Sequence, residues 1–265
     1  MSHKKTLLHA ALFLAAFLAA SGHAQAESLR EAALARGYDL PRPFGIGVSY
    51  LTQDQDFSID HLTLGIDSID PAVAAGLDIE NETDTIHLTA DYWILPFLDL
   101  YAILGNVDGT THVGLSQINI GLPLQDLDID YDGLLYGAGA VLAYGGDHVF
   151  VLVDVSYSWT NLSGSASSVE ALVATPRIGY DFGKVSVWGG AMYQEPDERH
   201  RGVVVIPGLG PVPYDVTLGS KDHWNYTAGL NVKLNEHWFA SLEGGFGPRS
   251  MVLAHFEYRF GSNDR

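Results

Sequence analysis

The chain has 265 residues, a formal net charge of −18 and no cysteine. A surface this acidic argues against nucleic acid as a partner, and the lack of cysteine excludes disulfides and thiol chemistry. The length suits a single domain of intermediate size, and no motif predicts a metal or another cofactor.

The N-terminus carries the signals of an exported protein. Two lysines precede a run from Leu7 to Ala20 that is apolar apart from one histidine, and Ala24-Gln25-Ala26 is a small-x-small cleavage site. This pattern predicts a signal peptide over residues 1–26. An uncleaved anchor is the alternative, but the apolar run is shorter than the roughly 20 residues that a spanning helix needs.

Residues 27–43 are expected to form a short periplasmic arm, with helical spacing over Ser28–Arg36 that ends at Pro41 and Pro43. From Phe44 onward, apolar and polar residues alternate, which indicates strands. Ten strands are predicted: Phe44–Thr52, Asp84–Ile94, Leu98–Val107, Tyr131–Tyr144, His148–Thr160, Val169–Phe182, Lys184–Gln194, Asp222–Leu234, His237–Phe246 and Met251–Phe260.

The connections between these strands alternate in length. Polar or long connections centred near residues 68, 118, 165 and 208 alternate with tight turns near 96, 146, 183 and 236. This alternation, with an apolar outward face, predicts an all-β, transmembrane antiparallel up-and-down barrel rather than a soluble sandwich with a polar exterior. Eight or twelve strands remain alternatives, because the first long loop could contain a further hairpin.

The last strand carries the most specific signal. Phe256, Tyr258 and Phe260 share one face, and this segment resembles the closing strand of bacterial outer-membrane β-barrels. The resemblance implies a barrel over residues 44–260, insertion by the barrel-assembly machinery, contact with outer-membrane lipid and a location in the outer membrane of a Gram-negative-type cell envelope. In that family the final phenylalanine usually ends the chain, whereas here a tail, residues 261–265, follows it. We expect a monomer.

Strand parity also predicts which charged residues face the barrel lumen. A narrow barrel is filled by side chains, so such groups are expected to form a structural network rather than a transport path. The predicted members are Asp99, Asp154, Arg177, Lys233, Glu243, Glu257 and Arg259. Asp154 and Arg177 are expected to lie opposite each other on neighbouring strands and to form an ion pair.

The segment Gln125–Asp132 alternates acidic and apolar residues. Calcium binding is one interpretation, but carboxylates two residues apart on a strand are about 6.6 Å apart and cannot all converge on one ion. A hydrated rim strand is favoured, with a bulge near Gly133 that would turn the acids away from lipid. The external acidic loops could attract cations or basic partners.

Enzymes exist among outer-membrane barrels, so candidate catalytic groups were compared with their geometry. The ten-stranded omptin proteases use Asp and His near the outer rim, and the nearest matches here are Asp222-His223 and Asp197 with His200. Adjacent residues on a strand point to opposite faces, so Asp222 and His223 cannot act as one dyad.

The outer-membrane lipid hydrolases need Ser and His exposed to lipid, whereas His87 and His255 are predicted to face the lumen. We therefore expect a non-enzymatic barrel, either a structural or binding protein or a narrow, porin-like channel. An omptin-like protease or a lipid-modifying hydrolase is the alternative, and no catalytic residue is assigned.

Overall fold

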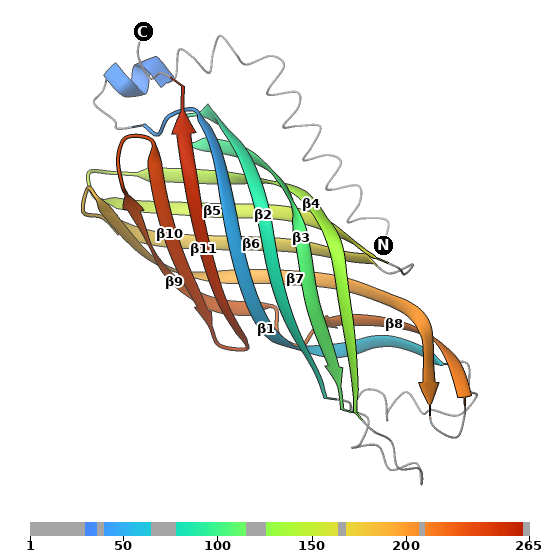
Figure 1. Ribbon diagram of the computed structural model, residues 1–265. Helices are drawn as coiled ribbons and strands as arrows, with labels where there is room; N and C mark the ends of the chain where they lie inside the picture. Colours follow the sequence, from blue (N-terminus) through green and yellow to red (C-terminus); the bar gives the residue numbers. More distant parts are fainter. Residues whose placement is uncertain are drawn as a thin grey trace.

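The computed structural model describes residues 30–35, 40–64, 78–114, 126–163, 168–206 and 210–261. These residues form a closed antiparallel β-barrel, with one short helical segment over residues 30–35 near one end (Figure 1). The strands are β1 Phe44–Leu64, β2 Ile79–Leu95, β3 Leu98–Val113, β4 Leu127–Gly145, β5 Val149–Leu162, β6 Ser168–Asp181, β7 Val185–Ile206, β8 Gly210–Ser220, β9 Trp224–Lys233, β10 Trp238–Phe246 and β11 Arg249–Phe260. The predicted signal peptide and most of the tail lie outside the described residues.

Ten of the described strands close the main ring, which confirms the predicted barrel and its strand number. Each strand from β1 to β7 pairs with the next, β7 pairs with β9, and β11 closes the ring against β1. The closing register places Phe44 opposite Phe260 and Val48 opposite Phe256. No backbone edge is left open along this seam, as a barrel in lipid requires.

The outer end of the barrel is built differently. Strand β8 lies between β7 and the second half of β1, so at this end the ring consists of β1 to β8. Strands β8 and β9 run in the same direction and are separated only by Lys221–His223. The hairpin β10–β11 therefore ends where β8 begins to pair with β1, and β1 continues beyond the hairpin tip toward the outer end (Figure 1).

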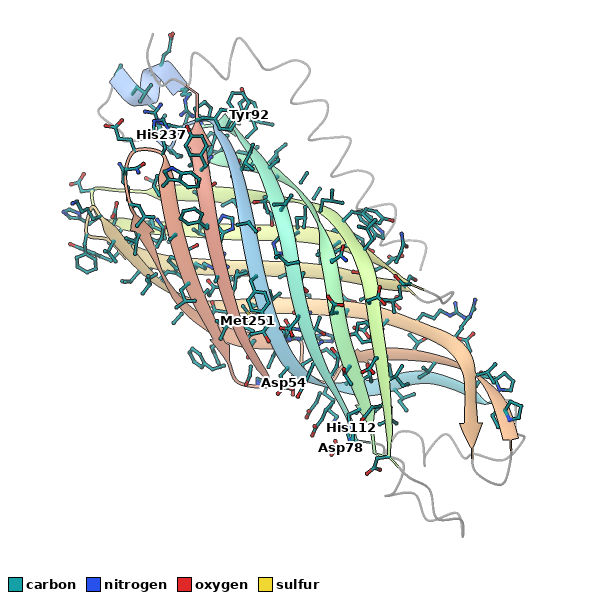
Figure 2. All side chains as sticks on the ribbon, in the orientation of Figure 1. Asp54, Asp78, Tyr92, His112, His237 and Met251 are labelled. Atoms are coloured by element: carbon teal, nitrogen blue, oxygen red, sulfur yellow. The ribbon has the colours of Figure 1, made fainter. Side chains whose placement is uncertain are left out.

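A band of apolar side chains surrounds the ten-stranded part. It includes Ile46, Leu88, Leu104, Leu142, Val153, Ile178, Leu230, Leu242 and Val252, each exposed on the outside. The tight turns lie at the end near Tyr92 and His237, whereas Asp78 and His112 lie at the opposite end (Figure 2). An apolar band with short turns at one end is the architecture of a bacterial outer-membrane barrel, and the tight-turn end is the periplasmic one. No helix within the described ranges is long and apolar enough to cross a membrane.

Several strands continue well beyond their predicted ends. Strand β1 reaches Leu64, and β2 begins at Ile79, within a region that we expected to be one long loop. These extensions lie on the outer side of the apolar band, where the outward face of the strands meets water. The hydropathy alternation that marks a strand in lipid is therefore lost, although the backbone pairing continues.

The long connection predicted near residue 208 was also predicted wrongly. It contains the end of β7 and the whole of β8, which form a hairpin. Pro211 and Pro213 lie near its tip, beyond Tyr214, the last residue of β8 that pairs with β1. At these two positions β8 pairs with β7 but no longer with β1 among the described residues. Proline is tolerated at such an edge because its missing N–H then costs no ladder hydrogen bond.

The bulge expected near Gly133 is absent. The pairing of β3 with β4 runs without a shift from Leu98–Leu142 to Val113–Leu127. Asp128, Asp130 and Asp132 therefore stay on the outward face and are exposed. No change of phase is needed because this part of β4 lies beyond the apolar band, in water.

Candidate functional site

The lumen is packed by aromatic side chains that lie on glycines of the neighbouring strand. Tyr101 lies over Gly139 and Trp188 over Gly229, and a Cβ atom at either glycine would collide with the ring. Phe150 on Gly179 and Tyr131 on Gly109 repeat the arrangement. Glycine is required at these positions because any side chain would displace the ring that fills the lumen.

A central ion cluster crosses this lumen. The guanidinium of Arg177 on β6 donates two hydrogen bonds to Glu243 on β10, at 2.6 and 2.9 Å. Trp188 Nε1 donates to the same carboxylate, and Tyr101 OH donates to Asp154 at 2.6 Å. The Glu243 side chain is only 2% exposed. The bidentate pair is of the strong, charge-assisted kind, and it ties together strands that are not neighbours.

The predicted ion pair of Asp154 with Arg177 is present, but the predicted cross-strand register is wrong. Asp154 lies opposite Thr175, and Arg177 lies opposite Leu152, because the β5–β6 register is centred one residue earlier than we expected. Arg177 Nη1 still lies 3.7 Å from Asp154, but Glu243 is its principal partner. Sequence parity places the carboxylates of Asp154 and Glu243 in the lumen, but it cannot show which strands face each other across the lumen.

A periplasmic ion cluster lies closer to the tight turns. Arg259 on β11 pairs with Asp91 at 2.6 Å and with Glu257, and its Nε donates to the backbone oxygen of Arg42 at 3.0 Å. Asp99 is buried beside this group. Lys233, also predicted for the lumen network, lies at the periplasmic end of β9 and forms no ion pair within the described part of the chain.

Sequence reasoning missed Asp91, Tyr101 and Trp188, which complete the two clusters. Each lies at an inward position of a strand, so parity alone would have found them. Asp91 lies on the same inward face of β2 as Thr85 and His87. Buried carboxylates need hydrogen-bond donors, and neutral side chains such as Tyr101 can supply them.

The histidines of the spanning strands lie inside, as expected. His255 Nδ1 lies 2.7 Å from Ser49 Oγ, and Ser49 is buried. His87 is an inward residue whose Nδ1 has no hydrogen-bond partner. A Ser–His pair that faces the packed lumen does not meet the lipid face on which a lipid hydrolase of this architecture acts.

An apolar cluster lies in the outer, eight-stranded part of the lumen, next to buried polar residues such as Asn81 and Thr111. Phe57 on β1, Ile79 on β2 and Leu218 on β8 are almost fully buried and pack against one another. This apolar cluster lies at the outer end, opposite the periplasmic ion cluster. It gives the barrel interior a third filled layer of different chemistry.

The outer surface of β1 to β4 carries an acidic face. Its exposed carboxylates occupy neighbouring cross-strand positions above the apolar band: Asp54, Asp56, Glu80, Glu82, Asp84, Asp108, Asp128, Asp130 and Asp132. A shallow depression of about 390 Å³ lies over part of this face. The described residues contain no group of three or more His, Cys, Asp or Glu side chains that could hold a metal ion.

Ion pairs outside the membrane band shift the pKa values of two groups, one on the acidic face and one on β8. A hydrogen bond to Asp128 raises the pKa of His112. On β8, bonds from Arg199 and Arg201 lower the pKa of Asp215 to about 2. Both groups lie at the solvent-accessible surface, so these pairs contribute little to stability.

Among the described side chains, Asp222 and His223 do not form a catalytic pair. His223 Nδ1 lies 3.1 Å from the backbone oxygen of Gln194, and its ring lies beside Tyr193. Asp222 is the adjacent residue and is exposed. Asp197 lies on the outward face of β7, and the side chain of His200 lies outside the described residues.

The predicted assembly signal lies on the closing seam. Phe260 stacks with Phe44 at 5.6 Å between ring centroids, and Phe256 stacks with Trp238 at 4.7 Å. Tyr258 contacts both Trp238 and Phe260. These contacts join β11 to both neighbouring strands, and recognition of the segment by the assembly machinery stays a prediction.

No family model and no curated protein matches this chain. Among solved structures, it is similar to the outer membrane protein OprG of Pseudomonas aeruginosa, with 12% identity, a TM-score of 0.48, and 83% of this chain and 98% of that chain covered. The Escherichia coli outer membrane protease OmpT is similar at 9% identity and a TM-score of 0.46, covering 84% and 99%. The translocator domain of the Neisseria meningitidis autotransporter NalP has 16% identity and a TM-score of 0.43, covering 90% and 96%. At these values the similarity concerns the fold alone.

Proposed function

We propose that this protein is a non-enzymatic outer-membrane barrel with a closed lumen, which acts as a structural or binding protein through its external surface. The observation that carries the proposal is the bidentate bond between Arg177 and Glu243 across the interior. An open channel hydrates its lumen charges, whereas these two side chains are 13% and 2% exposed and satisfy each other. Solute passage would require this pair to separate in a poorly hydrated space.

The external face supports the binding half of the proposal. The acidic face on β1 to β4 has few neighbouring cations, among them Lys221, which lies 3.6 Å from Asp56 and 3.3 Å from Asp78. An array of like charges on one sheet face raises the local concentration of cations. Basic partners or metal cations are therefore the class of ligand that this surface would attract, with weak and salt-dependent binding.

Conductance measurements test the closed lumen. Purified protein in planar bilayers should show no steady open-channel current. A variant that combines Arg177→Ala, Glu243→Ala and Trp188→Ala removes the central ion cluster and should conduct more than the native protein if it folds. Large and steady currents from the native barrel would overturn the proposal and make a diffusion channel the better reading.

Loss-of-function variants address the enzymatic alternative. Nothing in the described geometry favours it, since the candidate Asp and His side chains do not converge. A protease or lipase activity of the native protein that is lost in His223→Ala, but retained in the exposed control His148→Ala, would establish it.

A further inference from the structure

One buried arginine of the lumen has no acidic partner among the described residues. Arg249, the first residue of β11, is 1% exposed and lies between β1 and β8. Its Nε donates to Gln55 Oε1 at 2.7 Å, and its Nη2 donates to Ser220 Oγ at 3.3 Å. Its Nη1 is buried and has no hydrogen-bond partner in the described part of the chain. Both partners are neutral, so the positive charge is not compensated.

The other two lumen arginines are held differently. Arg177 and Arg259 each contact two carboxylates, whereas no carboxylate oxygen in the described residues lies within 4.0 Å of Arg249. A buried cation without a counter-charge is strongly unfavourable. The chain thus supplies acids to two buried arginines and leaves the third without one.

A small pocket lies beside this arginine. It has a volume of about 160 Å³, and Gln55, Ser220 and Arg249 form its buried part. The exposed residues Asp56, Lys221, Asp222 and Pro248 form its rim. Lys221 Nζ lies 3.6 Å from Asp56, and Ser220 Oγ donates to the backbone oxygen of Asp222 at 2.6 Å. The rim therefore contains one further cation and two acids, one of which is paired with that cation.

The pocket lies at the outer boundary of the apolar band. It adjoins the tip of the β10–β11 hairpin, and the exposed aromatic residues Trp224, Tyr226 and Phe246 surround this tip. Such aromatic residues mark the level of lipid head groups in outer-membrane barrels. Phosphate groups are thus within reach of the rim, in addition to anions in free solution.

We propose that this pocket binds a phosphate-type oxyanion, and that Arg249 is its principal ligand. The guanidinium edge formed by Nη1 and the second N–H of Nη2 remains available, and such an edge matches two oxygens of a phosphate group. Lys221 at the rim is already held by Asp56 and Asp78, so the buried guanidinium supplies the uncompensated charge. The oxyanion belongs either to free phosphate or to the head group of an outer-leaflet lipid.

The test is the thermal stability of the folded barrel in an uncharged maltoside detergent, in which phosphate is compared with chloride at equal ionic strength. Phosphate should raise the melting temperature of the native protein by about 2–4 °C, because a ligand that binds only the folded state stabilises it. Arg249→Gln should abolish this response. Gln55→Glu should abolish it too and should raise the melting temperature without phosphate, because the new carboxylate supplies the missing charge from within the chain.

Gln53→Glu is the matched control. Gln53 lies on the same inward face of β1, two positions before Gln55, and does not line the pocket. This variant adds the same charge, and its response to phosphate should persist. Because Gln55→Glu keeps the arginine, it decides the question even if Arg249→Gln does not fold.

Native mass spectrometry distinguishes the two sources of phosphate. Protein extracted from membranes should retain a phosphate-bearing lipid if a head group is the ligand, and the Gln55→Glu variant should retain none. A response to free phosphate without retained lipid would identify the free ion. The proposal is overturned if the native protein shows neither effect, which would leave only water in the pocket, or if Gln55→Glu behaves like the native protein in both assays.

Discussion

Breaking the central ion cluster should be costly, and the cost should depend on which partner is removed. Arg177→Met keeps the apolar stem of the side chain but removes both hydrogen bonds to Glu243. The carboxylate, 2% exposed, would retain only the Trp188 donor. Leaving a buried charge without its partner costs about 3–5 kcal/mol of unfolding free energy. Glu243→Gln, which still offers an oxygen to Arg177, should cost about 1–3 kcal/mol.

A double-mutant cycle isolates the pair itself. The combination of Arg177→Met with Glu243→Gln should cost less than the sum of the single changes by about 1–3 kcal/mol, because neither charge is then left alone. Asp154→Asn combined with Arg177→Met should show less than about 1 kcal/mol of coupling, since Asp154 is the more distant and more exposed partner.

Urea titration in neutral lipid vesicles measures these energies, with folded and unfolded chains separated by their heat-dependent migration on gels. The fluorescence of Trp188, which donates to Glu243, reports the same transition locally. Strictly additive effects for Arg177 with Glu243 would refute the buried pair. Stronger coupling to Asp154 than to Glu243 would show that the cross-strand partner predicted from the sequence is the important one.

Three further changes test other parts of the molecule. Val153→Arg, in the apolar band, should destabilise the barrel by about 2–4 kcal/mol, whereas Val203→Arg, on the outward face of β7 beyond that band, should have almost no effect in the same urea titration. Phe260→Asp should leave unfolded chain in the periplasm while Phe260→Tyr assembles normally, as judged by the folded band on an unheated gel. The pKa of His112, measured by NMR, should lie above about 6.5 and should fall in Asp128→Asn. Because folding raises this pKa, the pair stabilises the folded state below about pH 6.5, and this stabilisation is lost as the pH rises through the pKa of the folded protein.

The spanning strands could be predicted because lipid imposes a strict pattern. Val149, Val151, Val153 and Val155 are all exposed on one face, as their alternation with polar or larger residues indicates. The same requirement does not apply beyond the membrane. There, both faces of β8 can carry polar residues or proline, so the only remaining signal is backbone pairing, which a single sequence does not display.

The candidate site could be predicted less completely for a geometric reason. Parity tells which side of the wall a residue faces, and it assigned Arg177 and Glu243 to the lumen correctly by position. Contacts across the lumen depend on the stagger of all the strands between β6 and β10, and an error of one residue in a single loop changes them. The glycines under Tyr101 and Trp188 were a usable signal, since an inward glycine opposite an inward aromatic residue predicts a filled lumen.

The change from ten to eight strands links the fold to the closed lumen. Barrel diameter increases with strand number, so the outer part, in which β8 replaces the last three strands, is narrower than the part in the membrane. The narrow part holds the apolar residues Phe57, Ile79 and Leu218, whereas the wider part holds the two ion clusters. Large apolar side chains and the hydrogen-bonded Asn81 help to close the narrow part, whereas paired charges and aromatic rings packed on glycines close the wider part. Removing one ion cluster should therefore destabilise the barrel without opening a path for ions. Variants that lack only one ion cluster should conduct far less than a variant in which Phe57 is truncated as well.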